Sequence, residues 1–239
     1  MWSWEAFFSF LHNPLMIQGA WTTVWLTAVS MALALPLAVL VALGRASHIA
    51  PVRLLAGFYV WLMRGTPLLV QLVIIYTGLP QLGLRLGVIS SALTGLVLNE
   101  AAYLSEIVRA GVLSVPRGQS EAARALGMPP WRVFRVVVMP QALRVMVPPL
   151  GNSFNGLLKT TTLVSVISVE ELLRRTQFAV QTNFRVLEGL TAAALYYLAM
   201  TTLWGLVQRW LEARVGRGHQ TSPSGGRRTK SVALELETR

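Results

Sequence analysis

The sequence predicts an all-α membrane protein with about five membrane-spanning helices. The composition gives the first reason: 54% of the residues are hydrophobic and 13% are charged, whereas soluble proteins average about 25% charged residues. The placement of charge gives the second, because residues 6–44, 65–84 and 189–208 contain no Asp, Glu, Lys or Arg. A spanning helix needs about 20 mostly apolar residues, so each of these segments is long enough to cross a bilayer.

Two further segments are predicted to span although they contain charged residues. Residues 87–108 include Glu100 and Glu106, and residues 145–168 include Lys159. Both are otherwise apolar over about 20 residues. Together the segments predict a single membrane domain.

The distribution of basic residues predicts which side each end faces. No Lys or Arg occurs in residues 1–16, whereas basic residues gather in 45–64, 117–144 and 209–217. The positive-inside rule then places the N-terminus outside and the C-terminus in the cytoplasm. A tail rich in Gly, Ser and Arg has the composition of a disordered segment. The predicted organisation is an external N-terminus (1–16), a transmembrane domain (17–215) and a disordered cytoplasmic tail (216–239).

The residues from Glu121 to Gly127 predict a short helix with an abrupt end between two apolar segments. Ala and Leu are strong helix formers, Gly127 can adopt the left-handed conformation that closes a helix, and Pro129 and Pro130 prevent its continuation. A second helix is expected to start at Pro130, because proline suits a first helical turn. The smooth face of this unit predicts docking onto another protein. The alternative is an amphipathic helix that rests on lipid.

The spacing around this unit resembles the EAA motif of ABC importer permeases. The motif is carried by Glu121-Ala122-Ala123, Gly127 and Met139-Pro140, with Val137 and Met139 where the family has Ile and Leu. Other stretches resemble the polar amino acid branch of that family and bring the similarity to about residues 18–210; they are residues 64–71, 103–109, 116–119, 140–144, 148–152 and 158–159. The chain departs from the family at Thr160-Thr161-Thr162, where an acidic residue and a serine are usual.

The resemblance implies the membrane-spanning permease subunit of an ATP-driven importer for polar amino acids in a bacterial inner membrane. Residues 114–142 would form a cytoplasmic coupling-helix loop, steadied by an ion pair from Glu121 to Arg117 or Arg124. The implied partners are cytoplasmic ABC ATPase subunits, a second identical or related permease subunit, an external solute-binding protein and the lipid bilayer. The residues implied to contact the ATPase are Glu121, Ala122, Ala123 and Gly127.

ATP hydrolysis is not expected in this chain. Residues 151–160 superficially resemble a phosphate-binding loop, but that motif needs Lys directly after its second Gly, and Lys159 comes two residues too late. ATP and Mg²⁺ are therefore expected on the partner ATPase, with no cofactor and no catalytic residue here. No metal site is expected either, since Cys is absent and His12, His48 and His219 are far apart.

Polar residues within the predicted spans are candidates for the substrate path. A charge at the bilayer centre costs about 2.5–3.5 kcal/mol, so such a residue usually faces a cavity or a partner. Asn152 and Asn155 share one helix face with Lys159, and Glu100 lies midway along the preceding span. These four residues could meet the charged groups of an amino acid, or they could only join helices. The second interpretation includes an ion pair between Glu100 and Lys159 or between Glu106 and Arg109.

Two other segments have local signals. Thr66 is predicted to cap the second span, whose first turn contains Pro67. Residues 169–184 are predicted to form an external helix or an ordinary solvated loop. The resemblance implies that such a helix would contact a solute-binding protein.

Three rival functions are disfavoured by the sequence. A secondary transporter often shows inverted repeats and paired broken helices, which about five spans with a single cytoplasmic coupling loop do not match. An intramembrane enzyme would need a catalytic motif such as Gly-x-Ser-x-Gly or His-Glu-x-x-His, and none is present. The formal net charge of +11 could suggest nucleic-acid binding, but its concentration beside the apolar segments is typical of membrane topology.

Overall fold

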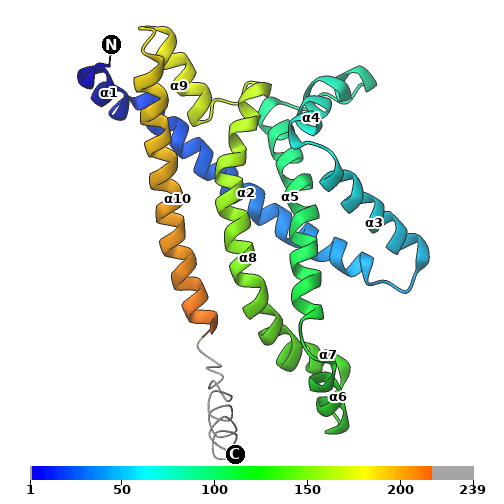
Figure 1. The fold of residues 1–239 in the computed structure, drawn as a ribbon. Helices are drawn as coiled ribbons and strands as arrows, with labels where there is room; N and C mark the ends of the chain where they lie inside the picture. Colours follow the sequence, from blue (N-terminus) through cyan, green and yellow to red (C-terminus); the bar gives the residue numbers. More distant parts are fainter. Residues whose placement is uncertain (1, 217–239) are drawn as a thin grey trace, which may run out of the picture.

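The protein is a bundle of long helices in the computed structural model, which describes residues 2–216 (Figure 1). Every regular element within those residues is helical. Four stretches are long and apolar enough to cross a membrane, or up to 5 if one bent pair counts as a span. The predicted all-α membrane bundle is thereby confirmed. The predicted disordered tail lies outside the described residues, except for Gly216.

The chain starts with a short helix, α1 (Trp4–Leu11), and then enters the first span, α2 (Pro14–Arg45). The side chain of Asn13 caps α2 by accepting a hydrogen bond from the Leu15 amide, and Pro14 occupies the first turn, where no N–H is needed. α2 runs obliquely across the bundle behind α5 and α8 (Figure 1). The small residues buried along it, which permit this close crossing, are Ala34, Ala38 and Ala42.

The second apolar segment differs from the single straight span predicted over residues 65–84. Helix α3 (Ala50–Gly65) is followed by α4 (Leu68–Val73), a π-helical turn η1 (Ile74–Gly78) and a 3-10 turn η2 (Leu79–Leu82). The two halves meet at 105°. Thr66 breaks the helix because a residue before proline is disfavoured in the helical region, and its backbone is extended (φ −117°, ψ 145°).

The capping role predicted for Thr66 is wrong. Pro67 holds the N-cap position of α4 and makes no side-chain capping bond. The Thr66 hydroxyl instead donates to the Leu62 carbonyl at 2.8 Å. It therefore serves the end of α3 rather than the start of α4.

The remaining spans follow the predicted order. α5 (Val88–Leu113) contains the predicted span 87–108 almost entirely, and α10 (Val186–Gly216) contains the predicted span 189–208. Between them lie α6 (Arg117–Ala125), α7 (Pro130–Val133), the π-helical turn η3 (Phe134–Val138), α8 (Met139–Thr160), the 3-10 turn η4 (Thr161–Ile167) and α9 (Leu172–Gln181). The span predicted over 145–168 belongs to a longer helical stretch from Pro130 to Ile167.

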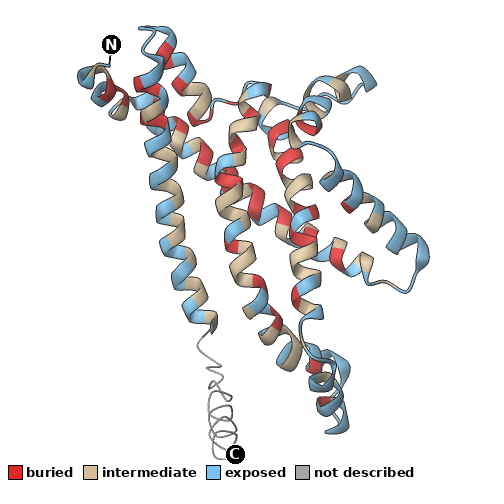
Figure 2. Cartoon of the chain, viewed as in Figure 1, coloured by how far each residue is buried: buried red, intermediate tan, exposed pale blue. Residues whose placement is uncertain are grey.

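Two apolar clusters hold these helices together (Figure 2). The larger joins α2, α4, α5, α8 and η4 around Leu26, Leu72 and Leu96, and the smaller joins α1, α9 and the first turns of α10 around Phe10, Leu172 and Ala192. In the most apolar window of α10 only 11% of residues are buried, against 44% in α5. Most of α10 therefore faces outward from this chain.

Candidate functional site

Residues 117–138, here called the projecting unit, extend beyond one end of the bundle (Figure 1). The unit consists of α6, α7 and η3. It lies at the end where α10 finishes, opposite the end that carries α4 and α9. It contains four arginines and one glutamate, so its surface is strongly basic.

A glycine closes α6 as the sequence predicts. Gly127 has φ +78°, in the left-handed region. Its amide donates to the Arg124 carbonyl at 2.9 Å, and the Met128 amide donates to the Ala123 carbonyl at 3.2 Å. This pair of bonds is a Schellman motif, which satisfies carbonyls at the helix end. No atom lies within 4 Å of a Cβ built at Gly127, so the need for glycine is conformational rather than steric.

The residues predicted to contact an ATPase do not all face outward. Glu121, Ala122 and Gly127 are exposed, but Ala123 is only 6% exposed and lies against the rest of the unit. Leu126 is 83% exposed at the end of α6. The predicted ion pairs from Glu121 to Arg117 or Arg124 do not form among the described residues. The unit thus presents a small-residue face with one apolar side chain at its tip, which suits close approach by another protein.

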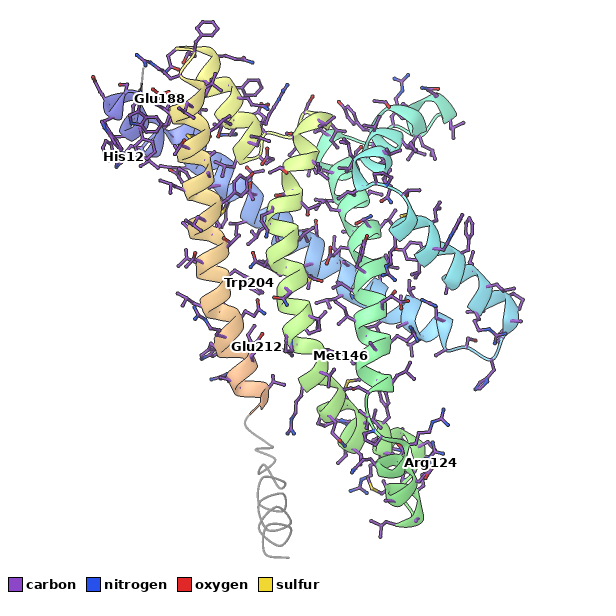
Figure 3. The ribbon with its side chains drawn as sticks, in the orientation of Figure 1. His12, Arg124, Met146, Glu188, Trp204 and Glu212 are labelled. Atoms are coloured by element: carbon purple, nitrogen blue, oxygen red, sulfur yellow. The ribbon has the colours of Figure 1, made fainter. Side chains whose placement is uncertain are left out.

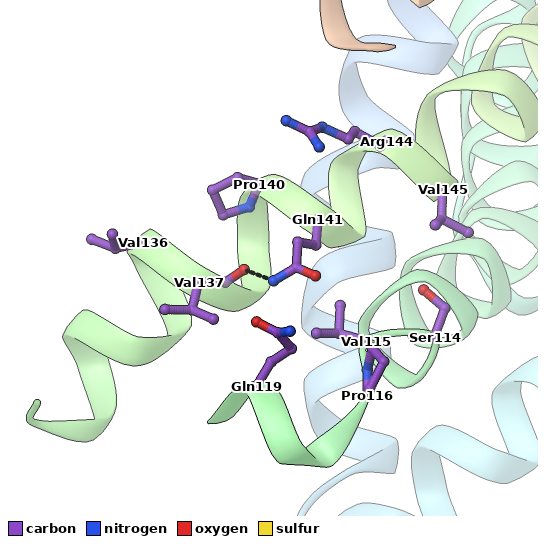
Figure 4. Close-up of a pocket in the computed structure, with 10 residues that line it drawn as sticks. All are labelled: Ser114, Val115, Pro116, Gln119, Val136, Val137, Pro140, Gln141, Arg144 and Val145. Atoms are coloured by element: carbon purple, nitrogen blue, oxygen red, sulfur yellow. Dashed lines mark hydrogen bonds between the residues drawn. The ribbon is translucent and has the colours of Figure 1, made fainter. Parts of the chain in front are cut away.

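The base of the unit contains a π-helical turn that proline explains. Pro140 has no N–H to donate to the carbonyl four residues before it, and its ring crowds that position. The chain widens into η3 just before it, and the Gln141 side chain donates to the Val137 carbonyl within η3 at 2.8 Å. Figure 4 shows this bond beside a cavity of about 690 Å³ between the α5–α6 connection and the start of α8. The base is therefore loosely filled.

The intramembrane glutamate Glu100 faces α8. The Ser153 side chain lies beside its carboxyl group, while its Oε1 atom is buried without a partner among the described residues. No ion pair joins Glu100 to Lys159 there, so that predicted alternative is wrong. Glu100 is left as a half-buried acidic group whose buried Oε1 atom has spare hydrogen-bonding capacity.

The three α8 residues predicted to form a polar strip lie in different surroundings. Asn152 accepts a bond of 3.3 Å from the Gln208 side chain of α10. Asn155 Oδ1 is buried without a partner among residues 2–216, and Lys159 is exposed. Since 153 and 155 are about 200° apart on a helix, Asn155 points away from the side of α8 that meets Glu100. The structure therefore does not bring all four predicted path residues together within one chain.

α8 and α10 are joined by a close contact that the sequence does not predict. Trp204 of α10 lies on the side of that helix nearer α8 (Figure 3). Its ring stacks on Phe154 with centroids 3.7 Å apart, and its Nε1 donates to the Gly151 carbonyl at 2.8 Å. A Cβ at Gly151 would approach the Gln208 side chain to 2.5 Å. A larger residue at Gly151 would therefore force the Gln208 side chain to move.

An ionic cluster joins α2 to α5 near the projecting unit. Glu106 pairs with Arg109 at 3.0 Å and also with Arg45 at the end of α2. The predicted Glu106–Arg109 pair is confirmed. The second partner of Glu106, Arg45, was not predicted because it lies 61 residues away in the sequence. The cluster ties the ends of two spans.

The break between α3 and α4 is held by two side-chain amides. Gln71 Nε2 lies 2.9 Å from the Met63 carbonyl oxygen and 2.8 Å from the Thr66 hydroxyl. Asn99 Nδ2 donates to Gln71 Oε1 and to the Met63 carbonyl, each at 3.1 Å. These amides replace backbone partners that the break removes. The sequence signal was the pair of amides in otherwise apolar spans, but their partners were not inferable.

Helix α9 confirms that residues 169–184 include a helix, and its N-cap is buried. Glu171 is 0% exposed. Its carboxylate accepts bonds of 2.8 Å from the Arg174 amide and the Tyr197 hydroxyl, and Thr23 Oγ1 accepts from the Leu172 amide at 3.3 Å. Burial raises the pKa of the Glu171 carboxyl, and these hydrogen bonds partly oppose the rise. The side chain links α2, α9 and α10.

The fold defines a class: a multi-span helical membrane protein with a helix–glycine–helix unit that projects from one end. Residues 34–217 match the family model described as "Binding-protein-dependent transport system inner membrane component". The chain therefore belongs to this family, whose members are transport components and not enzymes. The resemblance to ABC importer permeases is confirmed.

Several proteins similar to this chain are named as components of amino-acid transporters. The glutamine transport system permease protein GlnP of Escherichia coli K12 is 38% identical over 210 residues, covering 84% of this chain and 93% of GlnP. The L-cystine transport system permease protein TcyB of Bacillus subtilis is 41% identical over 205 residues, covering 85% and 88%. A solved amino acid ABC transporter with histidines has a TM-score of 0.80 at 37% identity, covering 84% and 94%. The methionine transporter MetNI shares the fold, with a TM-score of 0.69 at 22% identity.

Proposed function

We propose that this chain is the permease subunit of an ATP-driven importer that brings polar amino acids into the cell. Family membership and the amino-acid transporters among its relatives support the substrate class. The observation that carries the mechanism is the projecting unit, a helix–glycine–helix element with an exposed small-residue face beyond the bundle. ATP and Mg²⁺ belong to the partner ATPase.

The projecting unit is the proposed coupling element. Glu121, Ala122 and Gly127 would contact the ATPase with Leu126 between the latter two, and buried Ala123 would fix α6 against the rest of the unit. The continuous helical stretch from Pro130 to Ile167 would carry movement of the docked ATPase into the membrane. Closure of two ATPase subunits would then change the side from which the substrate path is open.

The proposed topology places the projecting unit in the cytoplasm and the N-terminus outside. The four arginines of the unit support this orientation. α9 then lies at the external end, where a solute-binding protein would deliver the amino acid. The exposed length of α10 and the exposed apolar side of α3 leave room for a second permease subunit, identical or related.

Glu100 is the residue of this chain best placed to meet a substrate. Within residues 2–216 its Oε1 atom is buried without a partner, and an acidic group within a span usually meets a cation or a cavity. The amino group of an amino acid is such a cation. Lys159 and Asn155 lie on a different side of α8 from the one that meets Glu100. In a dimer, these two side chains of one subunit would therefore face a path shared with the second permease subunit.

The test is uptake by the assembled importer with Gly127 replaced. Gly127→Glu places a charge on the docking face and costs about 1–2 kcal/mol of left-handed backbone strain. We expect it to insert normally but to lose ATPase binding and ATP-dependent uptake of labelled amino acids in liposomes.

Gly83→Glu is the matched control, because Gly83 also has a positive φ of +86° and open space around it but lies at the opposite end of the bundle. It should retain uptake. Wild-type uptake by Gly127→Glu would contradict the proposed coupling. Uptake driven by an ion gradient without ATP would contradict the proposed function as a whole.

A further inference from the structure

A cavity of about 290 Å³ lies between α2, α5 and the base of the projecting unit. Its walls are almost entirely apolar, and the residues that line it include Leu35, Val39, Leu43, Val112, Phe134 and Leu150. The cavity follows α8 from Met139 to Leu150, a length of about 16 Å at ~1.5 Å per residue. That length matches one leaflet of a hydrocarbon core about 30 Å thick. Its shape therefore suits an acyl chain.

One charged side chain breaks this apolar lining. Arg109 contributes to the wall, and its Nε atom is buried without a hydrogen-bond partner among the described residues. Its terminal nitrogen pairs with Glu106, which Arg45 also engages. Two guanidinium groups therefore share one carboxylate, and the cluster keeps one positive charge in excess.

The cluster is accessible as well as positive. The Arg45 and Arg109 side chains are 30% and 41% exposed. A group that approached from the membrane surface could therefore reach both while an attached chain filled the cavity. Such a ligand would carry a negative headgroup and an apolar tail.

We propose that this cavity binds an anionic phospholipid of the cytoplasmic leaflet, with its phosphate at Arg45 and Arg109 and an acyl chain along α8. The proposal rests on the orientation given above, which puts this end of the bundle in the leaflet rich in anionic lipid. Phe134 belongs to the projecting unit and Met139 begins α8. The bound chain thus lies against the segment that would transmit ATPase movement, which makes transport sensitive to lipid composition.

Native mass spectrometry of the importer complex, exposed to equal amounts of dioleoyl-phosphatidylglycerol and dioleoyl-phosphatidylcholine, tests this proposal. We expect about fivefold preferential retention of phosphatidylglycerol, because one excess positive charge contributes ~1 kcal/mol near an anionic lipid and each 1.4 kcal/mol is a factor of ten. Arg109→Gln should abolish the preference. Val39→Trp should fill the cavity and reduce retention of both lipids.

Two matched variants separate the site from general effects. Leu40→Trp adds the same ring one residue along α2, where the side chain is 65% exposed and outside the cavity. Arg53→Gln removes an exposed arginine that bonds only to the Ser47 carbonyl among the described residues. Both should retain lipid as the wild type does. Equal retention of the two lipids by wild type, equal loss in Val39→Trp and Leu40→Trp, or a fully assembled complex without lipid would each overturn the proposal. Lipid retention is measured by mass spectrometry and does not depend on amino-acid uptake. Failure of the lipid proposal can therefore be distinguished from failure of the proposed function.

Discussion

The projecting unit and the α3–α4 break solve the same problem in opposite ways. Each must end one helix and start another whose N-cap is a proline, Pro129 in the first case and Pro67 in the second. At the unit, the backbone satisfies itself through the Gly127 Schellman motif. At the break, the backbone is satisfied by the side chains of Gln71 and Asn99. The projecting unit therefore needs no side chain to satisfy its backbone, whereas the α3–α4 break needs two.

This difference means that side chains of the projecting unit can contact a partner, whereas those of the break stabilise the fold. The unit keeps Glu121, Ala122 and Leu126 exposed, because none is needed for local structure. At the break, the polar side chains form hydrogen bonds within the chain, and the two helices meet at 105°. Substitutions at the break should therefore change stability, whereas substitutions on the unit should change association.

The largest effect is expected from Gln71→Leu. It removes three donor contacts and the acceptor for Asn99. Hydrogen bonds between membrane helices are worth about 0.6–2 kcal/mol each, so the total loss should be about 2 kcal/mol or more. Thermal unfolding of the purified protein in detergent should show a clear fall in Tm together with loss of uptake.

Gln81→Leu is the control for that variant. Gln81 is exposed and makes one long bond, 3.4 Å, to the Thr77 carbonyl. Its Tm should match that of the wild type. An unchanged Tm for Gln71→Leu would show that the break is stabilised without the amide network.

An intermediate effect, confined to association, is expected from Leu126→Ser. Full burial of a leucine contributes about 1.5–3 kcal/mol, and each 1.4 kcal/mol is a factor of ten in affinity. The Kd for the partner ATPase should therefore rise at least about tenfold, with no change in Tm. Leu82→Ser, at a leucine that is 78% exposed at the other end of the bundle, should leave the Kd unchanged. Equal affinities of the two variants for the ATPase would show that Leu126 is not part of the proposed docking face.

The smallest effect concerns Glu171, whose folded-state pKa is raised above the ordinary value of 4.5. As pH rises above that value, the unfolded chain releases its proton first, while the folded chain holds the proton up to the raised pKa. Stability must therefore fall with rising pH across that window. The Tm of Glu171→Gln should lack this fall, because glutamine keeps the capping acceptor without a titrating group.

Glu170→Gln provides the comparison for the pH series. Glu170 is exposed and pairs with Arg175 at 3.3 Å, so its replacement should leave the slope contributed by Glu171 in place. A wild-type slope in Glu171→Gln would mean that other groups cause the pH dependence.

Local signals predicted the projecting unit well. The end of α6 at Gly127 and the start of α7 at Pro130 depend on the conformations that single residues can adopt, and the sequence states those directly. The apolar spans were found because their composition reflects the membrane. The exposure of Leu126 and the burial of Ala123 were not found, because both depend on how α6 rotates against η3.

Contacts between distant residues could not be predicted. Gln71 and Asn99 are 28 residues apart, and Gln208 and Asn152 are 56 apart. Their pairing depends on how the helices pack, which periodicity does not encode. The charged run at 170–175 is a sharper case: Glu171 is fully buried while its neighbour Glu170 is exposed. Sequence alone offers no reason to choose between two adjacent glutamates.

The π-helical turn at η3 sets the direction in which the docking face points. A π turn holds one residue more than an α-helical turn, and each residue rotates the chain by about 100°. α6 and α7 are therefore rotated relative to α8 by a phase that a single residue defines. Insertion or deletion of one residue between Phe134 and Val138 would re-aim the whole face without altering any residue that touches a partner. Within this architecture, pairing between permeases and ATPases could diverge by a change in helical phase alone.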